Sequence, residues 1–223
     1  MVSEKRNILF FWGLGLLLLL LLLADLVLGS VLIPLKDIYE VIRGQSDNQN
    51  WIYILRDFRF PKAIAAILVG AGLSSAGLMM QTLFRNPLAG PYVLGISSGA
   101  TLGVAVFGMA AGYGGILAGS LGNTGTLGVV ISSVIGAALV MLMVIMVSTR
   151  VTDSVSILII GIMFGSISGA LVSVLQYFSD PDAVHSFLVW TFGSLDSDWN
   201  QLMVLAPITL IGVILSFFMQ KPL

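Results

Sequence analysis

The 223-residue chain has no cysteine, a single histidine and few charged residues, which make up only 9% of it. Without cysteine, the chain forms no disulfide, has no thiolate nucleophile and holds no Cys-ligated zinc or iron–sulfur centre. His185 stands apart from any carboxylate cluster, and the sequence contains neither an HExxH pattern nor a Gly-Lys pair. These absences argue against metal hydrolysis, triad chemistry and a P-loop. We therefore expect a chain that is not an enzyme, with no catalytic residue, metal or cofactor.

The chain also has too few charged residues for a soluble domain or for a protein that binds nucleic acid. The formal net charge is −1, and the basic residues are spread along the chain instead of forming the concentrated basic surface that phosphate binding needs. Hydrophobic residues, in contrast, make up 57% of the chain, and the mean hydropathy is +1.03. Such a composition lies far outside the range of soluble globular domains, so we expect the lipid bilayer to surround most of the chain.

Six stretches approach the length of about 20 apolar residues that a helix needs to cross a bilayer. They are residues 8–33, 63–83, 92–111, 127–147, 155–178 and 202–219. The first could be a secretory signal instead, but its apolar run is too long and no A-x-A cleavage site follows. Lipid offers no partner for unpaired backbone groups, and no segment alternates like a barrel strand. The sequence therefore predicts an all-α, polytopic bundle of transmembrane helices in one domain, residues 1–223.

Two amphipathic segments are predicted to lie at the membrane surface. Residues 34–44 begin with a proline and mix apolar with charged side chains. In residues 181–193, Asp180 can cap the helix, Pro181 suits its first turn and Gly193 can end it.

The distribution of Lys and Arg predicts a cytoplasmic N-terminus, with one conflict. In that orientation the cytoplasmic segments carry Lys5, Arg6, Arg85, Arg150 and Lys221. The outer loop between the first two stretches nevertheless holds Lys36, Arg43, Arg56, Arg59 and Lys62. We interpret this departure as a sign that these outer cations have a function.

Glycines recur every four residues in two of the stretches. One series is Gly95, Gly99 and Gly103, and the other is Gly161, Gly165 and Gly169. The spacing gives one helix face a smooth stripe, which allows close packing against another helix. The alternative is that part of the stripe lines a wide passage for a bulky solute.

The segment from Arg59 to Ala100 is the most specific part of the sequence. Pro87 ends one stretch after a polar Arg-Asn turn, and Pro91 begins the next helix. Its patterns R-x-P-K, V-G-A-x-L and R-N-P-L-A-x-P-x-x-L-G-x-x-x-G-A resemble the signature of the FecCD family. Members of this family are permease subunits of ABC importers for ferric siderophores, haem and vitamin B12. Residues 158–190 also resemble the family's later helices, so the resemblance covers nearly the whole chain.

The resemblance implies a subunit of about ten helices, of which this chain would supply about six. It implies a cytoplasmic ATPase dimer, an extracytoplasmic substrate-binding protein and a second permease subunit, identical or paralogous, in a bacterial inner membrane. Arg59 and Lys62 match the two basic residues with which the family docks the binding protein. The alternative is that both cations anchor the helix among lipid headgroups. The solute itself, a ferric siderophore, haem or cobalamin, is not distinguished.

We expect small and polar residues to line the translocation path. They are Gln81, Asn86, Pro87, Gly95, Ser97, Ser98, Gly99, Gly161 and Gly165. For Gln81 and Asn86, the alternative is that the amides satisfy backbone groups where helices break. The resemblance places the cytoplasmic gate in the turn of residues 150–156, with Thr152 and Ser154 at the constriction. The alternative there is an ordinary turn in which Thr152 or Asp153 caps the next helix.

Length is the main departure from the family. Family members continue into a coupling helix that seats on the ATPase and into further spans, so we expect a fragment or a truncated, non-functional permease. A secondary transporter is a second alternative, although such proteins place ionisable residues in mid-span and Asp25 is the one candidate. Dependence of uptake on ATP or on an ion gradient separates these classes.

Overall fold

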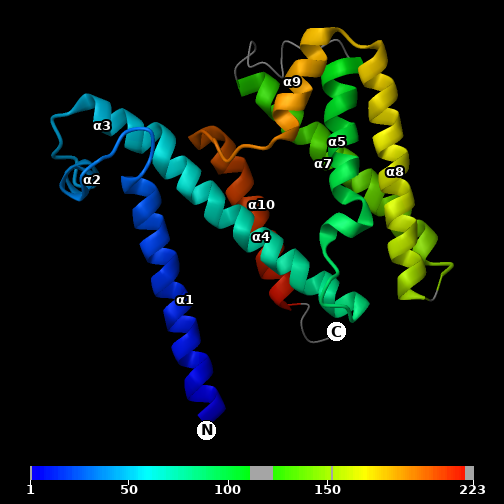
Figure 1. Cartoon of the computed structure of the whole chain (residues 1–223), viewed down its shortest axis with the longest axis horizontal. Coiled ribbons are helices and arrows are strands. Elements are labelled where there is room, and N and C mark those ends of the chain that lie inside the picture. The colour runs from blue at the N-terminus through cyan, green and yellow to red at the C-terminus, as the bar shows by residue number, and fades with distance from the viewer. Residues whose placement is uncertain (1, 111–122, 152, 219–223) are drawn as a thin grey trace. The chain divides into compact units, whose positions relative to one another are not determined.

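The computed structural model describes residues 2–110, 123–151 and 153–218, and all regular structure in these ranges is helical. The elements are α1 (Val2–Val27), α2 (Leu35–Ile42), α3 (Gln49–Tyr53), η1 (Ile54–Arg59), α4 (Phe60–Phe84), η2 (Pro91–Leu94), α5 (Ile96–Ala105), η3 (Val106–Ala110), α7 (Asn123–Ser148), α8 (Ser154–Phe178), α9 (Pro181–Thr191) and α10 (Trp199–Phe218). The predicted all-α class is therefore confirmed (Figure 1).

Five helices in the described part of the chain are long and apolar enough to cross a membrane. They cover Asn7–Val27, Gln49–Phe84, Leu127–Ser148, Val155–Phe178 and Trp199–Phe218. The stretch predicted at 92–111 is shorter than a full span within its described part, with an apolar helix at Ile96–Met109. The reason is Gly95, whose left-handed backbone, with φ at 73°, separates the short helix η2 from α5.

Two predicted boundaries differ from the structure. The first span ends at Val27 and not at residue 33, because the chain turns back there and Ile33 N–H donates to the Val27 carbonyl at 3.2 Å. The second span begins much earlier than residue 63, because α3, the π-helical η1 and α4 follow one another without a break. Arg56, Arg59 and Lys62 therefore lie on a helix, and the expectation that they belong to a loop is wrong.

Contacts divide the chain into two compact units. The first unit comprises the chain up to Val69 and Leu195–Pro207. Its main core joins the end of α1 to α2 and η1 through Leu26, Ile33, Ile38 and Leu55. A smaller cluster packs Ala65 and Leu68 of α4 against Leu202 of α10.

The second unit comprises Gly70–Ser194 and the chain from Ile208 onward. Within it, α5 packs against both α7 and α8, as Figure 1 shows. α9 covers one end of this group, where Phe187 is buried against a cluster that includes Val104 and Met109. Helices α2 and α9 match the two predicted amphipathic segments, and their place at a membrane surface stays a prediction.

Local signals in the sequence explain where α8 and α9 begin and end. Asp153 caps α8 by accepting a hydrogen bond from the Ser156 N–H at 3.1 Å. Asp180 occupies the N-cap position of α9 but makes no capping bond with its side chain, which corrects part of the expectation. Gly193, with φ at 75°, follows the last turn of α9 as predicted.

Gly99 of α5 and Gly95, which precedes it, allow this packing because they let the helix backbones approach each other closely. A Cβ on Gly99 would lie 2.6 Å from the Gly136 carbonyl oxygen of α7 and the same distance from the Val140 side chain. A Cβ on Gly95 would lie 2.6 Å from the Gly161 carbonyl oxygen of α8. Both distances are shorter than non-bonded atoms tolerate, so only glycine fits at these two positions.

We predict that Gly99→Ala destabilises the second unit by about 1–3 kcal/mol, because α5 and α7 must separate to admit the methyl group. Thermal unfolding of the purified chain in detergent measures the loss. Gly169→Ala is the matched control, since a Cβ there meets nothing within 4 Å. Equal stability of the two variants would contradict the close approach.

Candidate functional site

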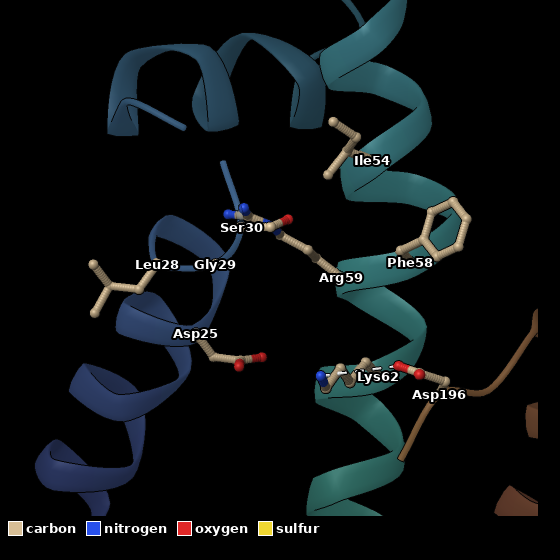
Figure 2. A pocket seen from close by; sticks show the side chains of 9 residues that line it. All are labelled: Asp25, Leu28, Gly29, Ser30, Ile54, Phe58, Arg59, Lys62 and Asp196. Atoms are coloured by element: carbon tan, nitrogen blue, oxygen red, sulfur yellow. Dashed lines mark ion pairs between the residues drawn. The ribbon is translucent and has the colours of Figure 1, made fainter. Parts of the chain in front are cut away.

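The two cations predicted to dock a partner, Arg59 and Lys62, lie about one turn apart where η1 meets α4. Around them is a cavity of about 340 Å³ within the first unit. Figure 2 shows the residues that line it: Asp25, Leu28, Gly29, Ser30, Ile54, Phe58, Arg59, Lys62 and Asp196. Two acidic and two basic side chains balance its charge.

Arg59 is directed away from solvent, and only 9% of it is exposed. Its guanidinium extends toward the end of α1 (Figure 2), where Nη1 donates to the Leu26 carbonyl and Nη2 donates to the Val31 carbonyl. Leu26 belongs to the last turn of α1, where helix carbonyls have no partner within the helix. Arg59 therefore caps the C-terminal end of α1, and its positive charge also suits the negative end of the helix dipole.

Gly29 makes room for this contact. A Cβ at Gly29 would lie 2.7 Å from Nη2 of Arg59 and 3.2 Å from the central carbon of its guanidinium. Any larger residue would push the guanidinium away from the two carbonyls. The contact between the Gly29 backbone and the Arg59 side chain thus fixes α1 to the helix η1–α4.

Lys62 is the accessible cation of the pair. Its Nζ lies 3.9 Å from Oδ1 of Asp196, and the two side chains are 48% and 79% exposed. An ion pair with this much exposure is worth only about 0–1 kcal/mol. Water or another carboxylate can therefore displace Asp196 from Lys62 at little cost.

Trp199 holds the segment that carries Asp196. Its indole Nε1 donates to the Arg56 carbonyl at 2.9 Å, which joins the start of α10 to η1. The Phe60 N–H donates to the Leu55 carbonyl instead of the Arg56 carbonyl, and Pro61 has no N–H, so the Arg56 carbonyl is open to a donor from another element. This bond places Asp196, three residues before Trp199, close to the first turn of α4.

The glycines predicted to line a path lie at contacts between helices. Gly95, Gly161 and Gly165 meet where α5 and η2 cross α8, and Gly99 faces α7. Ser98 also faces α8, since its Oγ lies 3.3 Å from the position of a Cβ on Gly165. These positions support close packing as the role of the glycines within this chain. Their part in a translocation path stays a prediction.

The remaining path residues lie in the last turn of α4, in the turn that follows it and at the start of α5. The Asn86 side chain accepts the Leu88 N–H at 2.9 Å, and its backbone N–H donates to the Gln81 carbonyl at 3.1 Å. Asn86 therefore supports the backbone of the turn around Pro87, which is the alternative stated for it. The side chains of Gln81 and Ser97 are exposed.

The predicted gate lies mostly outside the part that the structure describes. Thr152 is outside the described residues, and Ser154 begins α8 with a side chain that is not described. Asp153 accepts hydrogen bonds from both the backbone N–H and Oγ of Ser156 at 3.1 Å. This turn thus contains the capping interaction that the sequence offered as the alternative.

Sequence reasoning missed three residues of the site: Gly29, Asp196 and Trp199. A signal existed for Gly29, because a glycine just beyond an apolar helical run is typical of a helix end. No local signal pairs Asp196 or Trp199 with residues more than 130 positions earlier. Among the described residues, no group of three or more His, Asp or Glu side chains could hold a metal ion.

We predict that Arg59→Ala lowers the free energy of unfolding by about 1–3 kcal/mol, because two carbonyls near the end of α1 lose their donor. Arg56→Ala is the matched control, since the Arg56 side chain is exposed on the same segment. Denaturant titration of the purified chain in detergent measures both changes. If both variants are equally stable, the guanidinium does not hold α1.

Known proteins resemble this chain over nearly all of its length. The model of the FecCD transport family matches residues 16–223. The vitamin B12 import system permease protein BtuC of Klebsiella pneumoniae is 31% identical over 92% of this chain and 57% of its own length. The hemin transport system permease protein HmuU of Yersinia pestis is 32% identical over 92% of this chain and 60% of its own length.

Two further comparisons also find proteins named for the transport of metal chelates. A probable iron chelatin transport system permease protein of Helicobacter pylori is 37% identical over 64% of this chain and 40% of its own length. A solved structure described as an inward-facing conformation of a metal-chelate type ABC transporter aligns with a TM-score of 0.71 and 27% identity. That alignment covers 92% of this chain and 59% of the solved one.

The chain spans 40–60% of the length of these relatives. The five long apolar helices found among the described residues fit a multi-pass membrane protein. Because the family model matches all but the first fifteen residues, the chain belongs to the FecCD transport family.

Proposed function

We propose that this chain forms the membrane-spanning subunit of a binding-protein-dependent ABC importer. The observation that carries the proposal is the family match over residues 16–223, joined to the five helices in the described ranges that are long enough to cross a bilayer. Relatives named for vitamin B12, hemin and iron chelatin support a ferric siderophore, haem or cobalamin as the solute. The chain carries the passage, and a separate cytoplasmic ATPase dimer supplies the energy.

The proposed setting is a bacterial inner membrane, with the N-terminus in the cytoplasm and a second permease subunit alongside. Exposed polar side chains such as Gln81 and Ser97 would then face the path or the second subunit. Asp25 lies in the last turns of α1, close to the helix end, and not at mid-span. Its position supports an ATP-driven importer over ion-coupled transport, which needs ionisable groups deep in the membrane.

Uptake into proteoliposomes tests the proposal. The permease that includes these residues is reconstituted with the ATPase and the binding protein of its host, and labelled cobalamin, haem and a ferric siderophore are supplied in turn. We predict uptake of one class of solute that requires ATP inside and survives an ionophore. Uptake that needs no ATP and collapses with the ionophore would identify a secondary transporter instead.

Lys62 is the cation that we assign to docking the substrate-binding protein. It is half-exposed, whereas the guanidinium of Arg59 is buried against α1. Because Asp196 holds Lys62 only weakly, an acidic residue of the binding protein can take its place. Asp196 then competes with the partner for the same ammonium group.

We predict that Lys62→Glu weakens the binding protein's affinity about tenfold, because it sets two like charges against each other. Asp196→Asn should strengthen the same affinity by up to about fivefold, since it frees Lys62 from a pair worth at most about 1 kcal/mol. Surface plasmon resonance on the protein in nanodiscs measures both. Affinities unchanged in both variants would remove Lys62 from the docking surface.

A further inference from the structure

Helix α2 presents an apolar stripe that the described residues of its unit leave more than half exposed. Leu35, Tyr39 and Ile42 recur at the spacing of one helix face, and each is more than half exposed. Ile38 and Val41, on a different face, pack into the core beside Leu26 of α1. The helix is thus anchored to the protein by one face and leaves a second apolar face open.

Charged residues are ordered around the same helix. With 3.6 residues per turn, Lys36 and Arg43 lie about 90° from the middle of the stripe. Arg43 places its guanidinium carbon 4.5 Å from the centroid of the Tyr39 ring, at the edge of the stripe. Glu40 lies farther round, and its carboxylate pairs with Lys36 at 3.6 Å. From the stripe outward, the order is therefore apolar, basic and then acidic.

The position of α2 along the chain indicates what covers the stripe. It begins after residues 28–34, which turn back so that Ile33 N–H donates to the Val27 carbonyl at the end of α1. The apolar part of α1 has a mean hydropathy of 2.5 and is not buried by the other described residues, so it needs the apolar surroundings of a membrane interior. α2 is therefore held beside the end of this helix (Figure 1). The end of a membrane span lies where hydrocarbon meets headgroups.

We propose that α2 binds the bilayer surface, with its stripe in the acyl boundary and Lys36 and Arg43 at anionic phospholipid headgroups. The apolar, basic and acidic faces then meet hydrocarbon, phosphate and water in the order in which the interface presents them. Long basic side chains reach headgroups while their methylene stems cover apolar surface, and Tyr39 suits the same depth. This inference depends on the insertion of α1 in a membrane and not on the solute or the ATPase.

Single spin labels test the orientation of the stripe, and the absence of cysteine makes each label unique. Tyr39→Cys and Ile42→Cys carry the label on the stripe, and Glu40→Cys is the matched control on the polar face. The intact chain is reconstituted in vesicles of phosphatidylethanolamine and phosphatidylglycerol. Collisions with oxygen, which concentrates in lipid, are compared with collisions with a water-soluble nickel complex.

We expect oxygen to dominate at positions 39 and 42 and the nickel complex to dominate at position 40. Nickel dominance at all three positions would show that the stripe faces water and would overturn the proposal. Low access of both reagents to positions 39 and 42 would show that a protein surface covers the stripe, which overturns it equally.

A second variant tests the role of the cations. Arg43→Gln is combined with the label at position 42, and the depth of the label is compared in vesicles with phosphatidylglycerol and in vesicles of phosphatidylcholine alone. We expect the substitution to reduce the depth in the anionic vesicles and to leave it unchanged in the neutral ones. The same depth in both vesicle types, with or without Arg43, would overturn the assignment of the cations to anionic headgroups.

Discussion

Lipid offers no hydrogen-bond donor or acceptor, so every backbone group that enters a bilayer must find its partner inside the protein. Within a long helix the backbone groups bond to one another. At the C-terminal end of the helix, the last carbonyls have no partner inside it. In this chain the end of α1 is completed by Arg59, which comes from η1 and donates to two carbonyls near it. The contact also fixes where α1, α2 and α4 meet.

One buried arginine therefore has consequences for the whole first unit. Since Arg59 is occupied by α1, Lys62 is the accessible one of these two cations, and Trp199 brings Asp196 within reach of it. The same contact holds the end of α1 against η1, so that α2 lies beside the end of a span. The candidate docking residue and the proposed lipid-binding helix thus both depend on how α1 is capped.

The second unit depends on a different constraint, the close packing of one helix against another. Its helices approach through glycines at which a Cβ would overlap the backbone of the neighbouring helix. Apolar side chains gain little by leaving lipid for a helix contact, so close van der Waals packing must hold such helices together. The closely packed members of the two glycine series supply that packing, whereas Gly169 meets nothing within 4 Å; the closely packed glycines are Gly95, Gly99, Gly103, Gly161 and Gly165.

The sequence by itself determined the all-α class and most of the membrane helices, because a run of about 20 apolar residues has no other stable conformation in lipid. It also determined the turn at Pro87, the start of η2 at Pro91 and the end of α9 at Gly193, since proline and glycine act on their own backbone. Only the tertiary structure decided that Arg59 turns inward while Lys62 stays exposed, although both stand in one short pattern. That choice depends on partners elsewhere in the chain: the carbonyls of Leu26 and Val31, the gap at Gly29 and the carboxylate of Asp196. The local sequence does not predict such contacts, because they form only when distant elements pack together.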